Sequence, residues 1–215
     1  MKNRVNIYGF PHKGLRNALG QLSLKAGAVN ISNEHELEEL KILGNEVSEL
    51  LNLHLKAEEE FVLPPLESKV PGSTDGNHQD HLEMERLEDE MVNKLNALVK
   101  TPDIPAANDL YNQVNLFIRE YYRHMNDEED QMNKIIWEHF NDPEILEWQG
   151  KILAKLTPEQ FFKWFKFIIP ALLPEEQIIM LSGFKQNAPS QVYESTIHKL
   201  KPYLTENQLI HIQSI

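Results

Sequence analysis

The sequence contains two copies of a short pattern whose side chains could bind a metal. Residues 54–60 read HLKAEEE and residues 124–130 read HMNDEED, so the motif HxxxEE occurs twice, 70 residues apart. Imidazole nitrogens and carboxylate oxygens are suitable ligands for divalent transition metals. On an α-helix, side chains at positions i and i+4 lie on the same face. Each copy could therefore direct one histidine and one glutamate at a single ion, or bridge two.

Hydrophobic patterning separates the inward-facing copies from the others. The apolar stripe of the second predicted helix leads into His54 and Glu58, and that of the fourth leads into His124 and Glu128. An ionised glutamate on such a stripe would cost several kcal/mol unless something compensates its charge. By contrast, the pair His35/Glu39 lies off its stripe and is expected in solvent, as are His78, His139, His198, His211, Glu59, Glu60, Glu129 and Asp130.

The same inward faces begin with a histidine on the other two predicted helices. His12 precedes His54 by 42 residues and His81 precedes His124 by 43, so the pattern is an internal repeat. Two facing helix pairs would form a pseudo-twofold site for two metals, with Glu58 and Glu128 as bridges. The alternative is a set of core histidines satisfied by hydrogen bonds. The candidate metal ligands are His12, His54, Glu58, His81, Glu85, His124 and Glu128.

Glu85 is the position at which the repeat breaks. It lies four residues after His81, whereas the residue four after His12 is Arg16. Glu85 could be a seventh ligand, on one metal only. Alternatively, Glu85 and Arg16 could lie on solvated flanks or pair with each other.

The elements that must hold these residues are helices, because apolar residues recur at intervals of three and four and no strand-like alternation occurs. Long helices are predicted over 12–29, 33–63, 78–99 and 106–139, with breaks at proline-rich and glycine-rich segments. The fold class is therefore all-α. Residues 1–140 are expected to form an antiparallel four-helix bundle.

Residues 141–215 are predicted to form a helical extension packed on the bundle. Helix starts are indicated at Asp142-Pro143, at Pro174 and at Thr205, and Thr157 to Gln160 has the form of a capping box. Five aromatic residues fall within 161–167. They are expected to pack on the bundle, although a homodimer contact through this region is the alternative.

Composition excludes several classes of partner. The formal net charge is −12, which argues against nucleic acids and anionic membranes as partners. The chain has no cysteine, so any metal must be held by histidine, aspartate and glutamate. No signal-peptide core or membrane-spanning apolar run is found, and a cytoplasmic location is expected.

Four segments together resemble the hemerythrin-like, HHE cation-binding proteins: HKGLR at 12–16, HLKAEEEFVLPPLE at 54–67, HLEMERL at 81–87 and HMNDEEDQM at 124–132. The resemblance covers about residues 1–140. It implies a four-helix bundle around a non-haem di-iron centre, in which Glu58 and Glu128 are bridges. It also implies four terminal ligands, which are His12, His54, His81 and His124.

The resemblance favours iron, although Mn(II) or Zn(II) would also suit these ligands. Oxygen-carrying hemerythrins have a second histidine at the position of Glu85, which argues against simple oxygen carriage here. The leading hypothesis is a protein that binds or senses dioxygen, nitric oxide or iron. A di-iron oxidase or peroxidase is the second hypothesis, with Glu85 as its extra carboxylate, and a metal-free scaffold is the third.

Overall fold

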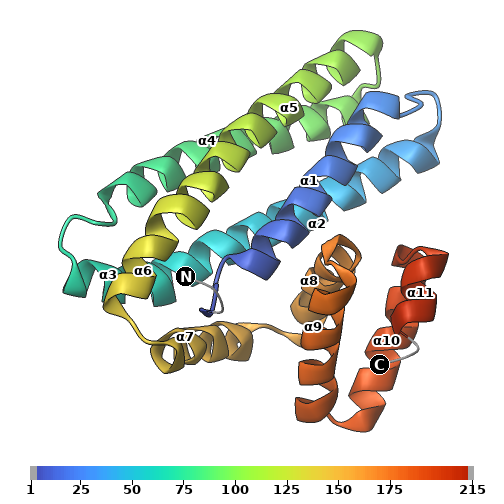
Figure 1. The fold of residues 1–215 in the computed structure, drawn as a ribbon. Coiled ribbons are helices and arrows are strands. Elements are labelled where there is room, and N and C mark those ends of the chain that lie inside the picture. The colour runs from blue at the N-terminus through green and yellow to red at the C-terminus, as the bar shows by residue number, and fades with distance from the viewer. Residues whose placement is uncertain (1–3, 213–215) are drawn as a thin grey trace.

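The computed structural model describes residues 4–212, and all regular elements in that range are helical. Four long helices form an antiparallel bundle, in which α1 packs on α2 and α5, and α4 packs on α5 and α2 (Figure 1). The all-α fold class and the four-helix bundle are thereby confirmed. The bounds of the four helices are α1 (Gly9–Ala28), α2 (Glu34–Ala57), α4 (Asp75–Lys100) and α5 (Ile104–Asp127).

Local capping explains where two of these helices begin. The Asn33 side chain accepts hydrogen bonds from the backbone N–H groups of His35 and Glu36, which starts α2. Asp103 caps α5 in the same way through the N–H of Ala106. Short polar side chains are favoured at this position because they satisfy N–H groups that have no partner within the helix.

In each half of the bundle, a π-helical turn begins at the first glutamate of the HxxxEE motif. Helix α2 continues through η1 (Glu58–Val62) into α3 (Leu63–Lys69), and α5 continues through η2 (Glu128–Met132) into α6 (Asn133–His139). In both turns a backbone N–H bonds a carbonyl five residues earlier, at Glu58 and at Glu128. Such turns are uncommon and are frequent at functional sites. The repeat seen in the sequence is thus also a repeat in backbone geometry.

The predicted break after residue 63 is wrong in position. Pro64 and Pro65 occupy the first turn of α3, where a missing N–H is tolerated, so the helix continues to Lys69. The break falls instead in the segment before α4, where Gly72 has a φ of 83° that favours glycine.

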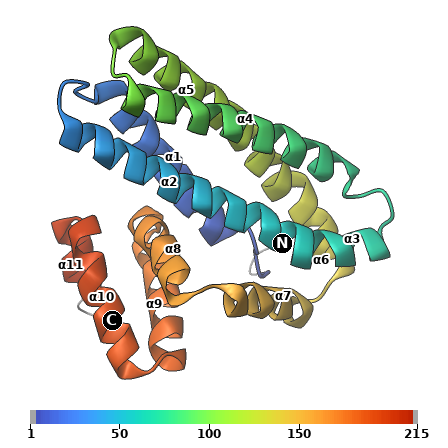
Figure 2. The ribbon, with the colours of Figure 1, turned by 180° about the vertical axis from the view of Figure 1, so that it is seen from behind.

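The C-terminal part adds a series of helices beside one end and one side of the bundle (Figures 1 and 2). They are α7 (Asp142–Lys155), α8 (Pro158–Ala171), α9 (Pro174–Asn187), α10 (Ser190–Leu200), the 3₁₀ turn η3 (Lys201–Tyr203) and α11 (Glu206–Ile212). The expected capping box at Thr157 and Gln160 is present. Among the described residues, no helix has the length and apolar character needed to cross a bilayer.

Helix α8 packs closely on α1. A Cβ added at Gly14 would lie 2.5 Å from Ile168 Cγ1, so glycine permits this approach. The Asn17 side chain donates to the Phe167 carbonyl at 2.8 Å. The aromatic residues of 161–167 contribute to this contact, since Trp164, Phe165 and Phe167 are buried. The division into domains at residue 140 and the homodimer contact remain predictions.

Candidate metal centre

Six of the seven predicted ligands meet inside the bundle. They form two groups that share both carboxylates, and within each group the potential ligand atoms lie within 4.8 Å of one another. One group is His12, His54, Glu58 and Glu128, and the other is Glu58, His81, His124 and Glu128. All six residues are buried. That each of them is a metal ligand remains a prediction.

Each carboxylate has one oxygen in each group. Glu58 Oε1 lies 3.4 Å from His54 Nε2, and Glu58 Oε2 lies 3.4 Å from His81 Nε2. Glu128 repeats this arrangement, with 3.3 Å from Oε1 to His124 Nε2 and 3.3 Å from Oε2 to His12 Nε2. A cation in each group would be bound by two imidazoles and two carboxylate oxygens. Both glutamates would then bridge the two cations.

Most of these ligand atoms lack a hydrogen-bond partner, which fits a site for a metal. Within residues 4–212, both Glu58 oxygens, Glu128 Oε2 and the Nε2 atoms of His81 and His124 are buried without a hydrogen bond. Buried polar groups in proteins almost always have a partner. Five such atoms around one point indicate a missing cationic partner rather than a core network, and this disfavours the hydrogen-bonded alternative.

Without that partner, burial perturbs the ionisation of the site. It raises the pKa of Glu58 to about 8, and burial together with the charge of Glu58 raises the pKa of Glu128 to about 8. Burial lowers the pKa of His54, and burial followed by the charge of His81 lowers that of His124 to about 3. Neutral imidazole is the form that binds metals. Burial opposes protonation of His12 as well, but its contacts with Glu128 and Glu129 outweigh burial and raise its pKa. His54 and His124 are thus in the form that binds a metal, whereas the two carboxyls must release protons.

A second layer of carboxylates orients two of the histidines across the repeat. The Nδ1 of His12 lies 2.8 Å from Glu129, and the Nδ1 of His81 lies 2.7 Å from Glu59. Each glutamate follows the bridging glutamate of the opposite half. Such a contact fixes the tautomer and leaves Nε2 for a metal. Glu59 is exposed, as expected, although its carboxylate also contacts His81, whereas Glu129 is only partly exposed.

The two halves differ at the flank that supports this second layer. Arg16 Nη1 donates to Glu129 at 2.6 Å, whereas Glu59 instead contacts His78 Nδ1 at 3.0 Å. Burial opposes ionisation of Glu129, but hydrogen bonds from His12 and Arg16 outweigh burial and lower its pKa to about 2. Arg16 therefore keeps the carboxylate behind His12 ionised.

Two tyrosines close the site at opposite sides. The Tyr8 ring centroid lies 5.1 Å from that of His12, and the Tyr121 centroid lies 5.8 Å from that of His124. Both hydroxyls are buried without a hydrogen bond in the described part of the chain. Desolvation raises the pKa of both phenols, so both keep their protons at neutral pH. They are hydrogen-bond donors available to a small ligand inside the bundle.

Glu85 is not brought to either group. It is exposed and lines a surface cleft with Glu59 and His78. His35 and Glu39 are also remote, and form an exposed pair at 3.6 Å. Of the other histidines, His78, His139 and His198 are exposed as expected, and His211 is partly buried.

The comparison with protein families agrees with this geometry. The fold and the paired groups define a four-helix bundle built to hold metal cations at its centre. The family model for the hemerythrin HHE cation binding domain matches residues 5–136. The chain therefore belongs to the hemerythrin HHE cation-binding family. Comparisons with curated proteins and with solved structures gave no match.

Sequence reasoning missed one buried acid, Glu88. Both the Ser48 hydroxyl and the Asn52 amide donate to its Oε1, the latter at 2.8 Å. Burial raises the pKa of Glu88 to about 7 despite these bonds. The signal was available, since Glu88 lies seven residues after His81 and seven-residue spacing returns to the same face of a helix.

Replacing Glu129 should weaken the site through His12. The Glu129→Gln variant keeps a hydrogen-bond acceptor for Nδ1 but removes the charge that increases imidazole basicity. We expect metal affinity to fall by about tenfold, as is common for partners of metal-binding histidines. Chelator competition with Zn(II) measures this. Asp130→Asn, at the adjacent exposed residue, is the control, and equal affinities in the two variants would contradict the role of Glu129.

Glu88 predicts a specific dependence of stability on pH. Its folded pKa of about 7 exceeds the ordinary 4.5, so the folded state retains a proton that the unfolded state releases. Its contribution therefore falls as pH rises from 4.5 to 7 and is constant above. Glu88→Gln, which keeps Oε1 as acceptor, should match the wild type near pH 4 and exceed it by on the order of 3 kcal/mol at pH 8.

Urea unfolding at pH 4, 6 and 8 gives the required free energies of unfolding. Glu138→Gln, at an exposed glutamate of α6, is the control and should show no such trend. A Glu88→Gln stability difference that does not change with pH would show that folding does not raise the pKa of Glu88.

Proposed function

We propose that this protein holds two iron ions, one in each group, bridged by Glu58 and Glu128. His12 and His54 are the remaining ligands of one ion, and His81 and His124 those of the other. The observation that carries the proposal is the shared pair of carboxylates, each with one oxygen in each group. Family membership supports it.

An iron pair with open coordination positions would bind small ligands such as dioxygen or nitric oxide reversibly and exchange electrons with them. The chain's own residues determine what surrounds that ligand. The bundle excludes bulk water, and Glu129 and Glu59 fix two of the imidazoles. Tyr8 and Tyr121 hold buried hydroxyl protons beside His12 and His124.

We infer a binding or sensing role rather than turnover. The alternative, a di-iron oxidase or peroxidase, would use a further carboxylate to stabilise oxidised iron, and Glu85 was its candidate. The exposure of Glu85, and its place outside both groups, support the first role. Without Glu85, each ion would have two histidine ligands and two carboxylate ligands.

Metal content tests the site directly. Protein purified from its native host should contain about two irons per chain, which is the capacity of a di-metal bundle site. The His54→Ala/His124→Ala variant removes one ligand from each group and should lose both ions. Glu58→Ala should lower both metal content and melting temperature, since binding stabilises the folded state.

The control for these variants is His35→Ala, whose side chain is exposed and distant from the site. It should keep the metal content and melting temperature of the wild type. Unchanged stoichiometry in Glu58→Ala would remove Glu58 from the bridge. Full metal content in the double histidine variant would refute the proposed centre.

Reaction with oxygen distinguishes binding from turnover. For reduced, iron-loaded protein we expect an absorption band that forms on mixing with oxygen and disappears when oxygen is removed. Tyr8→Phe, which deletes one buried donor, should speed ligand release by about tenfold, the effect of about one hydrogen bond. Stopped-flow spectroscopy measures both. Irreversible oxidation with consumption of a co-substrate would favour the oxidase.

A further inference from the structure

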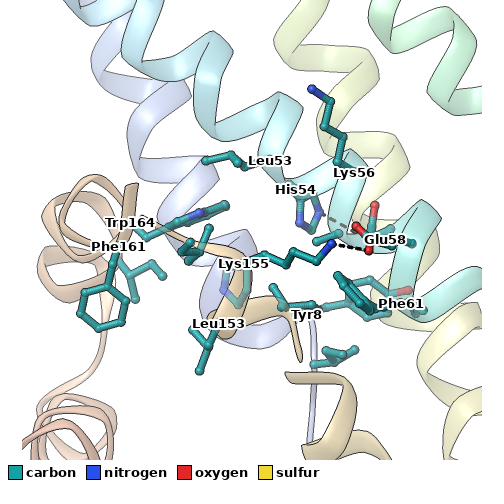
Figure 3. A pocket seen from close by; sticks show the side chains of 18 of the residues that line it. Tyr8, Leu53, His54, Lys56, Glu58, Phe61, Leu153, Lys155, Phe161 and Trp164 are labelled. Carbon is teal, nitrogen blue, oxygen red and sulfur yellow. Dashed lines mark hydrogen bonds and ion pairs between the residues drawn. The ribbon is translucent and has the colours of Figure 1, made fainter. Parts of the chain in front are cut away.

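An apolar pocket of about 260 Å³ lies between the metal end of the bundle and the C-terminal helices (Figure 3). The bundle contributes Leu53 and Phe61 to its walls. The C-terminal helices contribute Ile152 from α7, Trp164 and Phe165 from α8, and Met180 from α9. The pocket therefore exists only because residues beyond 140 pack against the bundle.

The inner end of the pocket reaches a carboxylate shared by both metal groups and only one of the four candidate histidines. His54 and Glu58 line it, together with Tyr8. His81 and His124 are not among its lining residues. The Trp164 ring forms an edge contact with His54, at 6.4 Å between ring centroids. A molecule in this pocket would lie beside the position shared by His12 and His54.

The pocket carries a cation at its mouth. Lys155, at the end of α7, extends across it toward Glu58 and Phe61 in Figure 3. Its Nζ is 2.7 Å from Glu60, and its side chain is 62% exposed. Lys56 also lines the pocket, but its amine points away (Figure 3). An ammonium group has three donors, so Lys155 can keep Glu60 and bind a second anion.

We propose that this pocket binds a medium-chain monocarboxylic acid. The carboxylate pairs with Lys155, and the hydrocarbon chain lies along Trp164 and Phe165 with its end toward His54. A mostly apolar lining with a few polar groups is typical of small-molecule sites. The charged residues that line this pocket are Lys56, Glu58, Glu60 and Lys155. At about 30 Å³ for each water in the liquid, the volume holds about nine groups of that size, which fits octanoate.

The charge of Lys155 at the mouth of the pocket favours a carboxylate over other possible occupants. A passage for dioxygen alone needs neither this volume nor a lysine. An alkylamine would meet Lys155 with like charge, although Glu60 could attract it. A neutral alcohol would fill the apolar walls but leave Lys155 unused. Octanoate, 1-octanol and octylamine are therefore the informative probes.

Isothermal titration of the full-length protein as purified tests the proposal. Octanoate should bind in a one-to-one ratio, more tightly than 1-octanol, and octylamine should bind most weakly. Lys155→Met should weaken octanoate by about fivefold, the upper range for an exposed ion pair, and leave 1-octanol unchanged. Lys151→Met is the matched control, because Lys151 lies one turn earlier on α7 and pairs with Glu147 outside the pocket.

A second pair of variants tests the apolar walls. Ile152→Phe adds bulk inside the pocket and should weaken octanoate and 1-octanol together by about tenfold. Ala154→Phe adds more bulk at an exposed position of the same helix that does not line the pocket, and should change neither.

Three results would overturn the proposal: no octanoate binding, a preference for octylamine, or octanoate binding that neither Lys155→Met nor Ile152→Phe weakens. The titration does not depend on which metal is present. Its failure would therefore leave the proposed iron centre intact, and loss of metal in the ligand variants would not decide the pocket.

Discussion

The structure depends on one electrostatic constraint: two carboxylates, Glu58 and Glu128, are buried side by side among four imidazoles. Burial raises the pKa of both well above the ordinary value, and the charge of Glu58 adds to the shift of Glu128. A pair of cations between the two groups would remove this penalty. A π-helical turn begins at each of these glutamates, so the same backbone feature accompanies the buried carboxylate in both halves.

The six candidate ligands and the carboxylates that contact them from outside have different roles. The inner six residues supply ligand atoms, and their number is set by the repeat. The outer layer fixes tautomers through a partner from the opposite half, as in the contacts of Glu129 with His12 and Glu59 with His81. This exchange couples the halves mechanically, since a shift of either π-helical turn moves a ligand and also the partner of a ligand on the other helix pair. Arg16 stabilises only one of the two contacts.

Much of this was predictable from sequence, for a physical reason. The inward positions of His12, His54, His81 and His124 follow from helical periodicity, and so does the four-helix bundle. The roles of Glu59 and Glu129 did not follow, because each contacts a histidine on another helix, and such a contact depends on how the helices pack rather than on the periodicity within one helix. Glu85 followed the i+4 rule but is exposed, whereas the buried acid on that helix is Glu88. The pocket was also beyond prediction, because its walls come from segments a hundred residues apart.

The C-terminal helices are more than a covering for the bundle. They pack tightly on the bundle where Ile168 meets Gly14, two residues from His12, and Trp164 contacts His54. Both points concern the same metal group. Neither histidine of the other group, His81 or His124, lines the pocket, although the shared Glu58 does. A bundle with an internal repeat would offer two equivalent metal positions, and packing these helices on one side makes them inequivalent. A ligand bound in this pocket would therefore lie beside His54, and its fit would be set largely by residues outside the repeat.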